Sequence, residues 1–299
     1  MPKLDAVVLT DPSSTLTTTF IPAAGMIGTS LADGDAEFLG QRRGLDAYLT
    51  NAKTLGIPLL YPWANRLSAN SYDVNGTVVA VHPGTGGVHV DEHGSPIHGT
   101  LAADPGWLVT DQTTNTLTAE LDFAGRPDLM ATFPFPHKLI QSVTLADRTL
   151  SIETTIEPAT STPVPLCFGY HPYLTIPGVP RQDWIIDTPA MRHLPVDDHG
   201  LPTGAHAPWP GGRSQLGTSS YDDGFDQVPD GAVFAVTGGD RRLEVRFEAG
   251  YPAAQIYAPP AETVVCFEPM AAPTDALRRG GYRVASGQPA VSRFSITVA

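Results

Sequence analysis

Apolar and polar residues alternate with a period of two in several short segments of this 299-residue chain. A period of two is typical of strands that bury one face and expose the other. In residues 150–156, for example, Leu150, Ile152 and Ile156 share one face. We therefore predict strands in the four segments with the clearest alternation, which are 117–123, 150–156, 243–248 and 294–298.

Glycine and proline, at 29 residues each, interrupt the chain too often for long helices. The best helical candidate is the short segment 45–55. Many short alternating strands separated by turns are typical of an antiparallel sandwich. The strands on both sides of the loop-rich stretch 195–220 look alike, so we predict an all-β fold with a single domain over residues 1–299.

The net charge of -13, from 18 basic and 31 acidic side chains, argues against nucleic acid or an anionic membrane as the main partner. The first five residues lack the apolar region of a signal peptide, and we find no apolar run of the roughly 18 residues that span a bilayer. Cys167 and Cys266 lie in apolar runs, which indicates buried and unreactive thiols. We expect a cytoplasmic protein.

The segment 168–173, FGYHPY, places His171 between two tyrosines. Proline after His171 disfavours helix and favours an extended backbone at this residue. Aromatic rings can stack on a sugar, and imidazole can transfer protons near neutral pH. Taken alone, His171 fits a hydrogen-bonded structural histidine better than a catalytic one.

Residues 56–67 form an apolar, proline-interrupted run that ends with Asn65, Arg66 and Leu67. Such a segment presents an amide and a guanidinium, whose N–H donors suit hydroxyl or ring oxygens. An isolated arginine is more often part of a surface ion pair. His98 follows in the segment SPIHG, where we expect Gly99 to let a ligand approach His98 closely.

A metal site is an alternative for this region, because His98 is the last of four histidines in a Gly-rich stretch, after His82, His89 and His93. Their spacings do not match a standard zinc pattern, and the two cysteines lie far away in the sequence. We therefore predict no metal ion.

Residues 220–226, SYDDGFD, contain Asp222 and Asp223 next to an aromatic residue. The segment fits a ligand-binding carboxylate or an Asx-rich turn that satisfies its own backbone. Its oxygen density also suits calcium, although the twelve-residue pattern of an EF-hand is absent.

Gln255 lies in the segment AQIY, which precedes an apolar strand, TVVCFE, that we expect to end before Pro269. Glu268 is the last residue of that strand. Partial burial would raise its pKa above the usual value of about 4.3 and make it a better base near neutral pH. The alternative is a strand-end charge in contact with water.

The order of these motifs resembles the aldose 1-epimerase (mutarotase) family. The order is Asn-Arg, His-Gly, His-Pro-Tyr, Asp-x-x-Phe, Gln-x-Tyr and a hydrophobic strand ending in Glu. The resemblance begins near Pro22 and reaches the last strand, and it implies a large antiparallel β-sandwich of the galactose mutarotase-like type with a sugar cleft on one sheet. The chain has Gly-Tyr-His-Pro-Tyr-Leu where many members have Asn-His-x-Tyr-Phe-Asn, and it doubles the acid at Asp222-Asp223.

The resemblance implies interconversion of the α and β anomers of a hexose without a cofactor. Glu268 corresponds to the catalytic base, His171 to the catalytic acid, and His98 to a second histidine that hydrogen-bonds the ring region. The sugar-positioning residues correspond to Arg66, Asn65, Asp222 and Gln255, and Trp63, Tyr170 and Tyr173 are candidates for an apolar platform.

Other functions remain as alternatives. A charged sugar, a hexose 6-phosphate or a sulfonated sugar, would need additional cations, which Arg42, Arg43, Lys53 and Arg126 could supply. A glycoside hydrolase needs two carboxylates, and the paired histidines would then have no role. A non-catalytic carbohydrate-binding domain would be expected to lose the pair His171 and Glu268. The sequence is compatible with a monomer or a homodimer.

Overall fold

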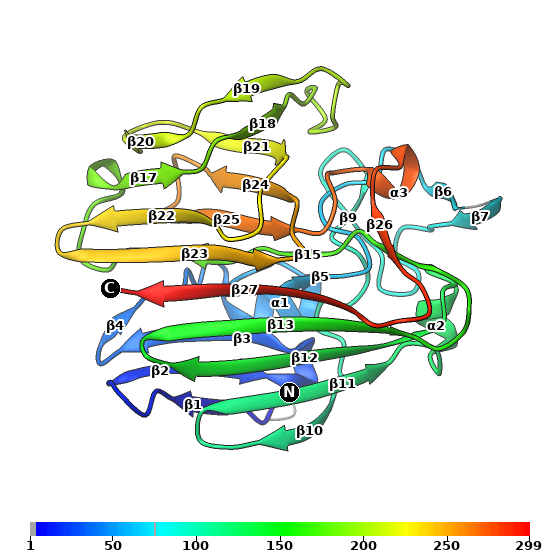
Figure 1. The fold of residues 1–299 in the computed structure, drawn as a ribbon, viewed down its shortest axis with the longest axis horizontal. Helices are drawn as coiled ribbons and strands as arrows, with labels where there is room; N and C mark the ends of the chain where they lie inside the picture. Colours follow the sequence, from blue (N-terminus) through cyan, green and yellow to red (C-terminus); the bar gives the residue numbers. More distant parts are fainter. Residues whose placement is uncertain (1–3, 75) are drawn as a thin grey trace.

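The alternating segments form long antiparallel strands in the computed structural model, which describes residues 4–74 and 76–299. The four predicted strands are confirmed as β11 (Thr116–Asp122), β13 (Thr149–Pro158), β23 (Arg241–Ala249) and β27 (Ala290–Val298). They belong to a nine-stranded sheet of order β10-β11-β12-β13-β27-β23-β22-β17-β20 (Figure 1). The other members are β10 (Leu108–Gln112), β12 (His137–Ala146), β17 (Ile185–Thr188), β20 (Gly212–Gln215) and β22 (Ala232–Gly238).

A second, eight-stranded sheet has the order β19-β18-β21-β24-β25-β15-β5, with β16 also paired to β25. Its strands are β5 (Leu59–Leu60), β15 (Gly169–Tyr170), β16 (Tyr173–Leu174), β18 (Met191–Leu194), β19 (Ala207–Trp209), β21 (Tyr221–Asp226), β24 (Ala253–Ala258) and β25 (Val265–Met270).

Aromatic side chains join the inner faces of these two sheets. The ring centroids of Phe234 on β22 and Phe267 on β25 are 5.5 Å apart, and those of Tyr170 on β15 and Phe294 on β27 are 4.9 Å apart. All four side chains are buried. The result is the large antiparallel β-sandwich that the sequence predicts.

Smaller elements flank the sandwich. A four-stranded sheet comprises β1 (Val7–Thr10), β2 (Leu16–Ile21), β3 (Ile27–Asp33) and β4 (Ala36–Glu37). The two-stranded sheets pair β6 (Ser71–Val74) with β7 (Thr77–Ala80), β8 (His89–Val90) with β9 (Pro96–Ile97), and β14 (Val164–Leu166) with β26 (Arg283–Ala285). Short helices are α1 (Gly44–Asn51), α2 (Pro127–Met130), α3 (Ala276–Arg279) and the 3-10 turns Pro22–Ala24 and Arg181–Asp183.

The helix predicted over 45–55 is confirmed, but it ends earlier than expected. Ala52 adopts a left-handed conformation with φ of 52°, and its N–H bonds the carbonyls of Ala47 and Tyr48. This local arrangement ends α1 at Asn51. Apolar residues beyond that point, such as Leu55, are buried without being helical.

Two strand boundaries differ from the prediction. The apolar run PLCF at 165–168, which leads into the His171 motif, also favours a short strand; this strand is β14, which ends at Leu166. The expectation that Pro269 ends the last candidate strand is wrong, because β25 continues to Met270. One edge of β25 pairs with β24. The other edge pairs only locally, with β16 at Cys266 and with β15 at Met270. A residue without an N–H is therefore tolerated between these positions.

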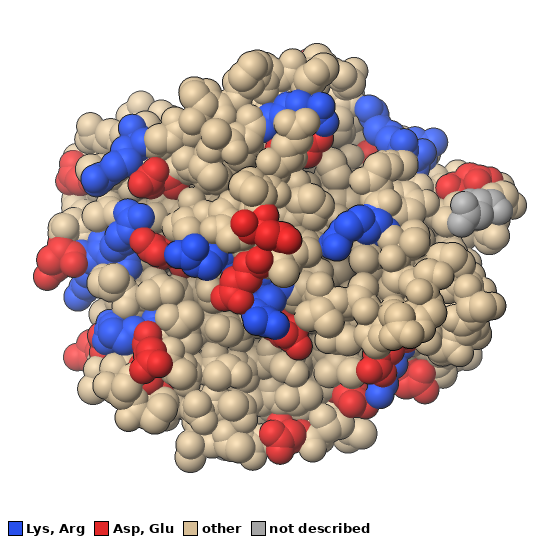
Figure 2. Space-filling model, in the orientation of Figure 1, with Lys and Arg blue, Asp and Glu red and all other residues tan. Residues whose placement is uncertain are grey.

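The outer face of the nine-stranded sheet carries acidic and basic side chains next to each other (Figure 2). Arg293 of β27, for example, lies 2.8 Å from Glu153 of β13 and 3.7 Å from Glu248 of β23. Such exposed pairs are worth roughly 0–1 kcal/mol each and make this face mixed rather than basic. Within residues 4–74 and 76–299, no helix is long and apolar enough to cross a membrane.

Candidate active site

The side chains of the eight-stranded sheet alternate between the core and a cleft. Phe267 of β25 packs into the core against Phe234, so the next residue, Glu268, points to the opposite face. On the neighbouring strand β24, Gln255 is directly opposite Glu268 and lies on the same face. The carboxylate of Glu268 and the amide of Gln255 therefore lie side by side on adjacent strands.

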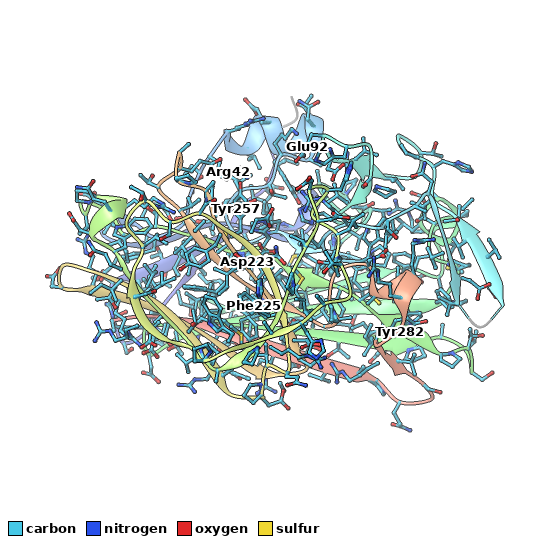
Figure 3. The ribbon with its side chains drawn as sticks, turned by 90° about the horizontal axis from the view of Figure 1, so that it is seen from above. Arg42, Glu92, Asp223, Phe225, Tyr257 and Tyr282 are labelled. Carbon is cyan, nitrogen blue, oxygen red and sulfur yellow. The ribbon has the colours of Figure 1, made fainter. Side chains whose placement is uncertain are left out.

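The cleft on this face has a volume of about 300 Å³. Figure 3 shows Arg42, Tyr257 and Glu92 on the side of the molecule away from the nine-stranded sheet, whereas Phe225 lies deeper. All seven residues that the sequence suggests as a site line this one cleft: Asn65, Arg66, His98, His171, Asp222, Gln255 and Glu268. They come from six motifs spread between residues 65 and 268.

A carboxylate and an imidazole are in direct contact at the bottom of the cleft. Glu268 Oε1 lies 3.2 Å from His171 Nε2, and the glutamate is only 1% exposed. Burial raises the pKa of Glu268 well above its usual value, and the nearby charge of Asp222 raises it further. Burial, together with His98 and Arg42, lowers the pKa of His171 well below its usual value. Opposite shifts of this kind favour a proton on Glu268 beside a neutral His171.

The short strands β15 and β16 hold His171 in place. Both pair with β25, and His171 lies between them, with its own N–H donating to the carbonyl of Pro58. The ring of Tyr173 stacks on the imidazole with a centroid distance of 4.3 Å and an angle of 15°. The Tyr173 hydroxyl lies 3.3 Å from Nε2 and the Glu268 carboxylate 3.2 Å from the same atom, so both side chains approach this nitrogen.

Arg42 closes one end of the cleft. Its guanidinium donates two hydrogen bonds to Glu262, of 2.7 and 2.8 Å, and a third of 2.9 Å to the hydroxyl of Tyr173. Sequence reasoning identified Arg42 only as a possible anion-binding residue. Its link to Tyr173 depends on tertiary structure across more than a hundred residues, and no local pattern signals it.

His98 lies beside the pair as a neutral histidine. Burial is the main cause that lowers its pKa to about 3, and Arg66 and His89 contribute. The backbone N–H of Asn65 donates to His98 Nδ1 over 3.3 Å, so Nε2 carries the proton and is a hydrogen-bond donor. The rings of His98 and His171 meet edge to face, with centroids 5.8 Å apart.

The expectation that Gly99 admits a ligand is wrong. A Cβ atom at Gly99 would lie 2.0 Å from the carbonyl oxygen of Tyr61, so the close approach is to the backbone of the protein itself. Asn65 and His98 adopt left-handed backbone conformations, with φ of 57° and 62°. Strained conformations of this type recur at functional sites, where the surrounding structure imposes them.

Arg66 reaches the cleft as part of an ion pair that is largely buried. Its Nε donates to Oδ2 of Asp91 over 2.7 Å, and the side chain of Asp91 is only 2% exposed. Nη1 lies 3.3 Å from Oδ1 of Asn65. The surface ion pair considered from the sequence is therefore a pair on the cleft wall, and sequence reasoning did not identify Asp91 as its partner.

The two adjacent aspartates point in different directions because they lie on a strand. The segment 220–226 is not an Asx-rich turn, since residues Tyr221–Asp226 form β21. Asp222 lines the cleft and accepts a 2.7 Å hydrogen bond from Nε2 of Gln255. Asp223 instead lies 2.8 Å from Nε2 of His193. Burial beside Asp223 and Glu92 raises the pKa of Asp222, partly offset by Arg66 and Gln255.

The candidate aromatic platform is narrower than the sequence suggests. Trp63 and Tyr170 are buried in the core, whereas Tyr173 lines the cleft together with Tyr257 of β24. Tyr257 is half-buried and belongs to the Gln-x-Tyr motif, so its position two residues after Gln255 could have identified it.

The cations proposed for an anionic sugar are also separated by the fold. Arg42, Arg43 and Lys53 line the cleft. Arg126 instead binds Asp104 and Asp128 over 3.0 and 2.7 Å.

The four clustered histidines do not converge. His89 and His98 line the cleft, whereas His93 packs against His199 with ring centroids 4.6 Å apart. Among residues 4–74 and 76–299, no group of three or more histidine, cysteine, aspartate or glutamate side chains is arranged to hold a metal ion. Both cysteines are buried, and burial raises their thiol pKa values, as expected for unreactive thiols.

Comparisons with known proteins agree with the fold and with the order of motifs. The profile of the family described as aldose 1-epimerase matches residues 13–296. A galactose mutarotase-like protein of Clostridium acetobutylicum has a TM-score of 0.81 at 15% identity, over 100% of this chain and 99% of that one. A galactose 1-epimerase of Lactobacillus acidophilus has a TM-score of 0.76 at 15% identity, over 99% of both chains. These likenesses confirm the predicted fold.

Among curated proteins, an uncharacterized protein of Escherichia coli, YihR, is 29% identical over 152 residues. The match covers 50% of this chain and 45% of that protein, so the chain is matched to less than half of the relative's length.

Proposed function

The chain belongs to the aldose 1-epimerase family, and on this premise we propose that it interconverts the α and β anomers of a neutral hexose by opening and closing the sugar ring. The observation that carries the proposal is the buried contact of 3.2 Å between Glu268 Oε1 and His171 Nε2 at the bottom of the cleft. A pair that shares one proton can supply a base and an acid at the same time.

Ring opening needs a base and an acid together. Glu268, in its ionised form, takes the proton from the C1 hydroxyl, and protonated His171 gives a proton to the ring oxygen. The bond between C1 and the ring oxygen breaks, and C1 becomes a carbonyl carbon. General acid–base catalysis of this kind contributes about 10²–10⁴-fold for each positioned group.

Ring closure reverses these transfers after the carbonyl group has turned. The C5 hydroxyl attacks the other face of the carbonyl, His171 takes the proton from that hydroxyl, and protonated Glu268 returns a proton to the carbonyl oxygen. The pair holds one proton before opening, in the open-chain intermediate and after closure. No cofactor is needed to balance the reaction, since nothing is oxidised or reduced.

The remaining residues of the cleft supply hydrogen bonds. Neutral His98 is a donor for oxygen atoms that gain negative charge during the reaction. The guanidinium of Arg66 is a donor for hydroxyl oxygens of the sugar. Asp222 and Gln255, joined by a 2.7 Å hydrogen bond, present acceptors and a donor to hydroxyl groups. Tyr257, which is half-buried, offers a ring surface for the C–H face of the sugar.

The charge balance of the cleft favours a neutral substrate. Its lining contains four cations, Arg42, Arg43, Lys53 and Arg66, and three carboxylates, Asp91, Glu92 and Asp222, besides the pair of Glu268 and His171, which has no net charge when it holds one proton. Glu262 also neutralises Arg42. A phosphate or sulfonate group would be expected to need an excess of cations. The charged-sugar alternative therefore rests on Arg43 and Lys53, which line the cleft outside any ion pair with another described residue.

The test is exchange spectroscopy by proton NMR on equilibrated sugars, which follows α/β interconversion directly. We expect the protein to accelerate exchange of glucose or galactose, and Glu268→Gln to lower the enzymatic rate by about 10²–10⁴-fold. The matched control is Glu262→Gln, which removes a carboxylate outside the proposed chemistry.

Acceleration restricted to a phosphorylated or sulfonated hexose would replace the neutral substrate with the charged one. Sugar binding without acceleration of any sugar would indicate a carbohydrate-binding protein and contradict the roles of Glu268 and His171. Hydrolysis of a glycoside would indicate a different reaction on the same face of the sheet.

A further inference from the structure

A six-residue pattern, Asp-x-His-Gly-x-Pro, occurs twice in the chain. The first copy is DEHGSP at 91–96, and the second is DDHGLP at 197–202. Neither copy belongs to the motifs that carry the proposed chemistry. The second copy lies in the loop-rich stretch 195–220, more than a hundred residues after the first.

Both copies fold into the same turn. In the first, Oδ1 of Asp91 accepts hydrogen bonds of 2.9 Å from the N–H groups of His93 and Ser95. In the second, Oδ1 of Asp197 accepts bonds of 2.9 and 3.0 Å from His199 and Leu201. The glycines have left-handed conformations in both turns, with φ of 82° at Gly94 and 70° at Gly200.

The two turns meet beside the cleft. The rings of His93 and His199 pack edge to face with centroids 4.6 Å apart. Contacts between aromatic rings of this geometry are favourable beyond the area they bury. The histidines therefore hold the tips of the two turns together.

Each turn also contacts Arg66. Asp91 of the first turn binds Nε over 2.7 Å. In the second turn, a Cβ atom at Gly200 would lie 2.7, 3.0 and 3.3 Å from Nη1, Cζ and Nε of Arg66. Three such similar distances place Gly200 over the flat face of the guanidinium. One edge of the group is thus bonded, and one face is covered by backbone that has no side chain.

We propose that the paired turns position Arg66 for the sugar, with Asp91 and Gly200 as positioning residues; this inference rests on the proposed function. A guanidinium has five N–H donors. Asp91 takes one and Asn65 takes another, over 2.7 and 3.3 Å, and the other three have no hydrogen-bond acceptor among the described residues. The turns fix the plane in which these three donors meet a substrate.

The same arrangement points to hydroxyl oxygens as the acceptors. Asp91 is almost fully buried and neutralises the charge of Arg66 at close range, and Glu92 adds a more distant, exposed carboxylate at 3.9 Å. A guanidinium paired in this way donates hydrogen bonds without offering a free positive charge. The paired turns therefore select for a neutral sugar oxygen at this position over a phosphate or sulfonate.

The test compares alanine at the same position of each turn. Gly200→Ala and Gly94→Ala impose the same left-handed strain, but a Cβ at Gly94 meets no atom within 4 Å. We expect Gly200→Ala to raise the KM of anomer exchange by about tenfold with kcat within about threefold, because binding common to substrate and transition state is lost. Gly94→Ala should leave KM within about twofold.

A double-mutant cycle shows whether Gly200 acts through the arginine. In an Arg66→Ala background, Gly200→Ala should have no further effect on KM. An equal rise in KM for both glycine variants, or an effect of Gly200→Ala that persists without Arg66, would overturn the proposal.

A readout without turnover separates this inference from the proposed function. The ¹⁵N–¹H resonance of Arg66 Nε, assigned from its absence in Arg66→Lys, should shift in Gly200→Ala and stay in place in Gly94→Ala. A wild-type protein that exchanges no sugar but shows this pattern would overturn the proposed function and support the positioning of Arg66. An Nε resonance that is unchanged in Gly200→Ala would overturn the positioning itself.

Discussion

At the scale of single residues, the contact between Glu268 and His171 explains why a buried carboxylate and a buried histidine occur side by side. An isolated charge in this position would be strongly destabilised by the loss of water. One shared proton lets the pair be either two neutral groups or an ion pair, and a transfer over 3.2 Å converts one form into the other. The two forms correspond to the protonation states of the proposed open-chain intermediate and of the closed-ring reactant.

We predict that the acid limb of kcat/KM does not lie at pH 6.5, where an ordinary histidine would titrate. The acid limb should lie well below that value, because burial lowers the pKa of His171, and the alkaline limb well above 4.5, because burial raises the pKa of Glu268. Arg42→Gln should move the acid limb to higher pH, since the charge of Arg42 lowers the pKa of His171. A pH–rate profile from exchange NMR checks both, and an acid limb at pH 6.5 in the wild type would contradict the lowered pKa of His171.

The residues of the cleft divide into those that the sequence predicts and those that only the fold reveals. Glu268 and His171 lie within specific motifs, which a linear sequence displays. Asp91 lies in a loop and acquires its role only because β9 brings the loop against Arg66, as the pairing of Arg66 with Ile97 shows. Arg42 and Tyr173 meet across 131 positions of the sequence.

At the scale of elements, strand alternation decides which of two neighbouring aspartates can reach a ligand. In β21, Asp222 is opposite Tyr257 of β24 and Asp223 is opposite Ile256. Tyr257 lines the cleft, whereas Ile256 is in the core, so the two aspartates fall on different faces. The sequence alone does not show which of the two aspartates faces the cleft, because the strand could place either one on that face and keep its alternation.

We predict different effects for two substitutions that remove the same charge. Asp222→Asn should raise the KM of the exchange reaction by about tenfold, because a charge-assisted hydrogen bond to a sugar hydroxyl is worth about 1.5–3 kcal/mol. Asp223→Asn should leave KM within about twofold, since Asp223 contacts His193 outside the cleft. Saturation curves for both variants check this, and equal effects would show that Asp222 does not contact the sugar.

The segment that carries His98 depends on one close backbone contact, which leads to a prediction about stability. Alanine at Gly99, with φ of 70°, would place Cβ 2.0 Å from the carbonyl of Tyr61. Alanine at Gly178, with φ of 79°, meets no atom within 4 Å. We expect Gly178→Ala to lower the free energy of unfolding by about 1–2 kcal/mol, and Gly99→Ala to lower it by more than about 4 kcal/mol. Urea unfolding measures both, and similar losses would contradict the contact.

At the scale of the whole molecule, the sequence predicts the long strands of the sandwich better than the short strands and the smaller sheets. Long strands with clean alternation, such as β13, are visible in the sequence because each buries one face only. In β25, by contrast, all six residues are buried, so period two disappears and the end of the strand is misplaced. The sheet β1–β4 and the two-residue strands β5, β15 and β16 depend on tertiary pairing, which short sequence windows do not contain.

The sandwich packs around one main hydrophobic cluster to which both large sheets contribute, for example Ile152 of β13 and Phe267 of β25. We therefore propose that residues 1–299 form a single domain that unfolds cooperatively. Under that condition, a change in the protonation of one buried pair affects the free energy of unfolding of the whole chain.

The buried pair then predicts how stability depends on pH. In the unfolded chain, Glu268 and His171 titrate near their usual values of 4.5 and 6.5. The raised pKa of Glu268 gives a contribution that is complete below pH 4.5 and is lost as the pH rises towards its folded value. The lowered pKa of His171 gives a contribution that is complete above pH 6.5 and is lost as the pH falls. Between pH 4.5 and 6.5, the two contributions change the free energy of unfolding in opposite directions and cancel. The pair alone therefore gives a plateau of stability in this range and a loss of stability on either side.

Glu268→Gln removes one of these two slopes and so isolates the effect. Without the titrating carboxylate, the loss of stability with rising pH disappears. Above pH 4.5, the free energy of unfolding of the variant should therefore rise relative to that of the wild type by up to about 1.4 kcal/mol per pH unit. Glu262→Gln, which removes a half-exposed carboxylate, should follow the wild type over this range. Urea unfolding at intervals between pH 4.5 and 8.5 measures the difference. A constant difference across this range would mean that Glu268 has a similar pKa in the folded and unfolded chains, which would also remove the basis for its use as a base matched to neutral pH.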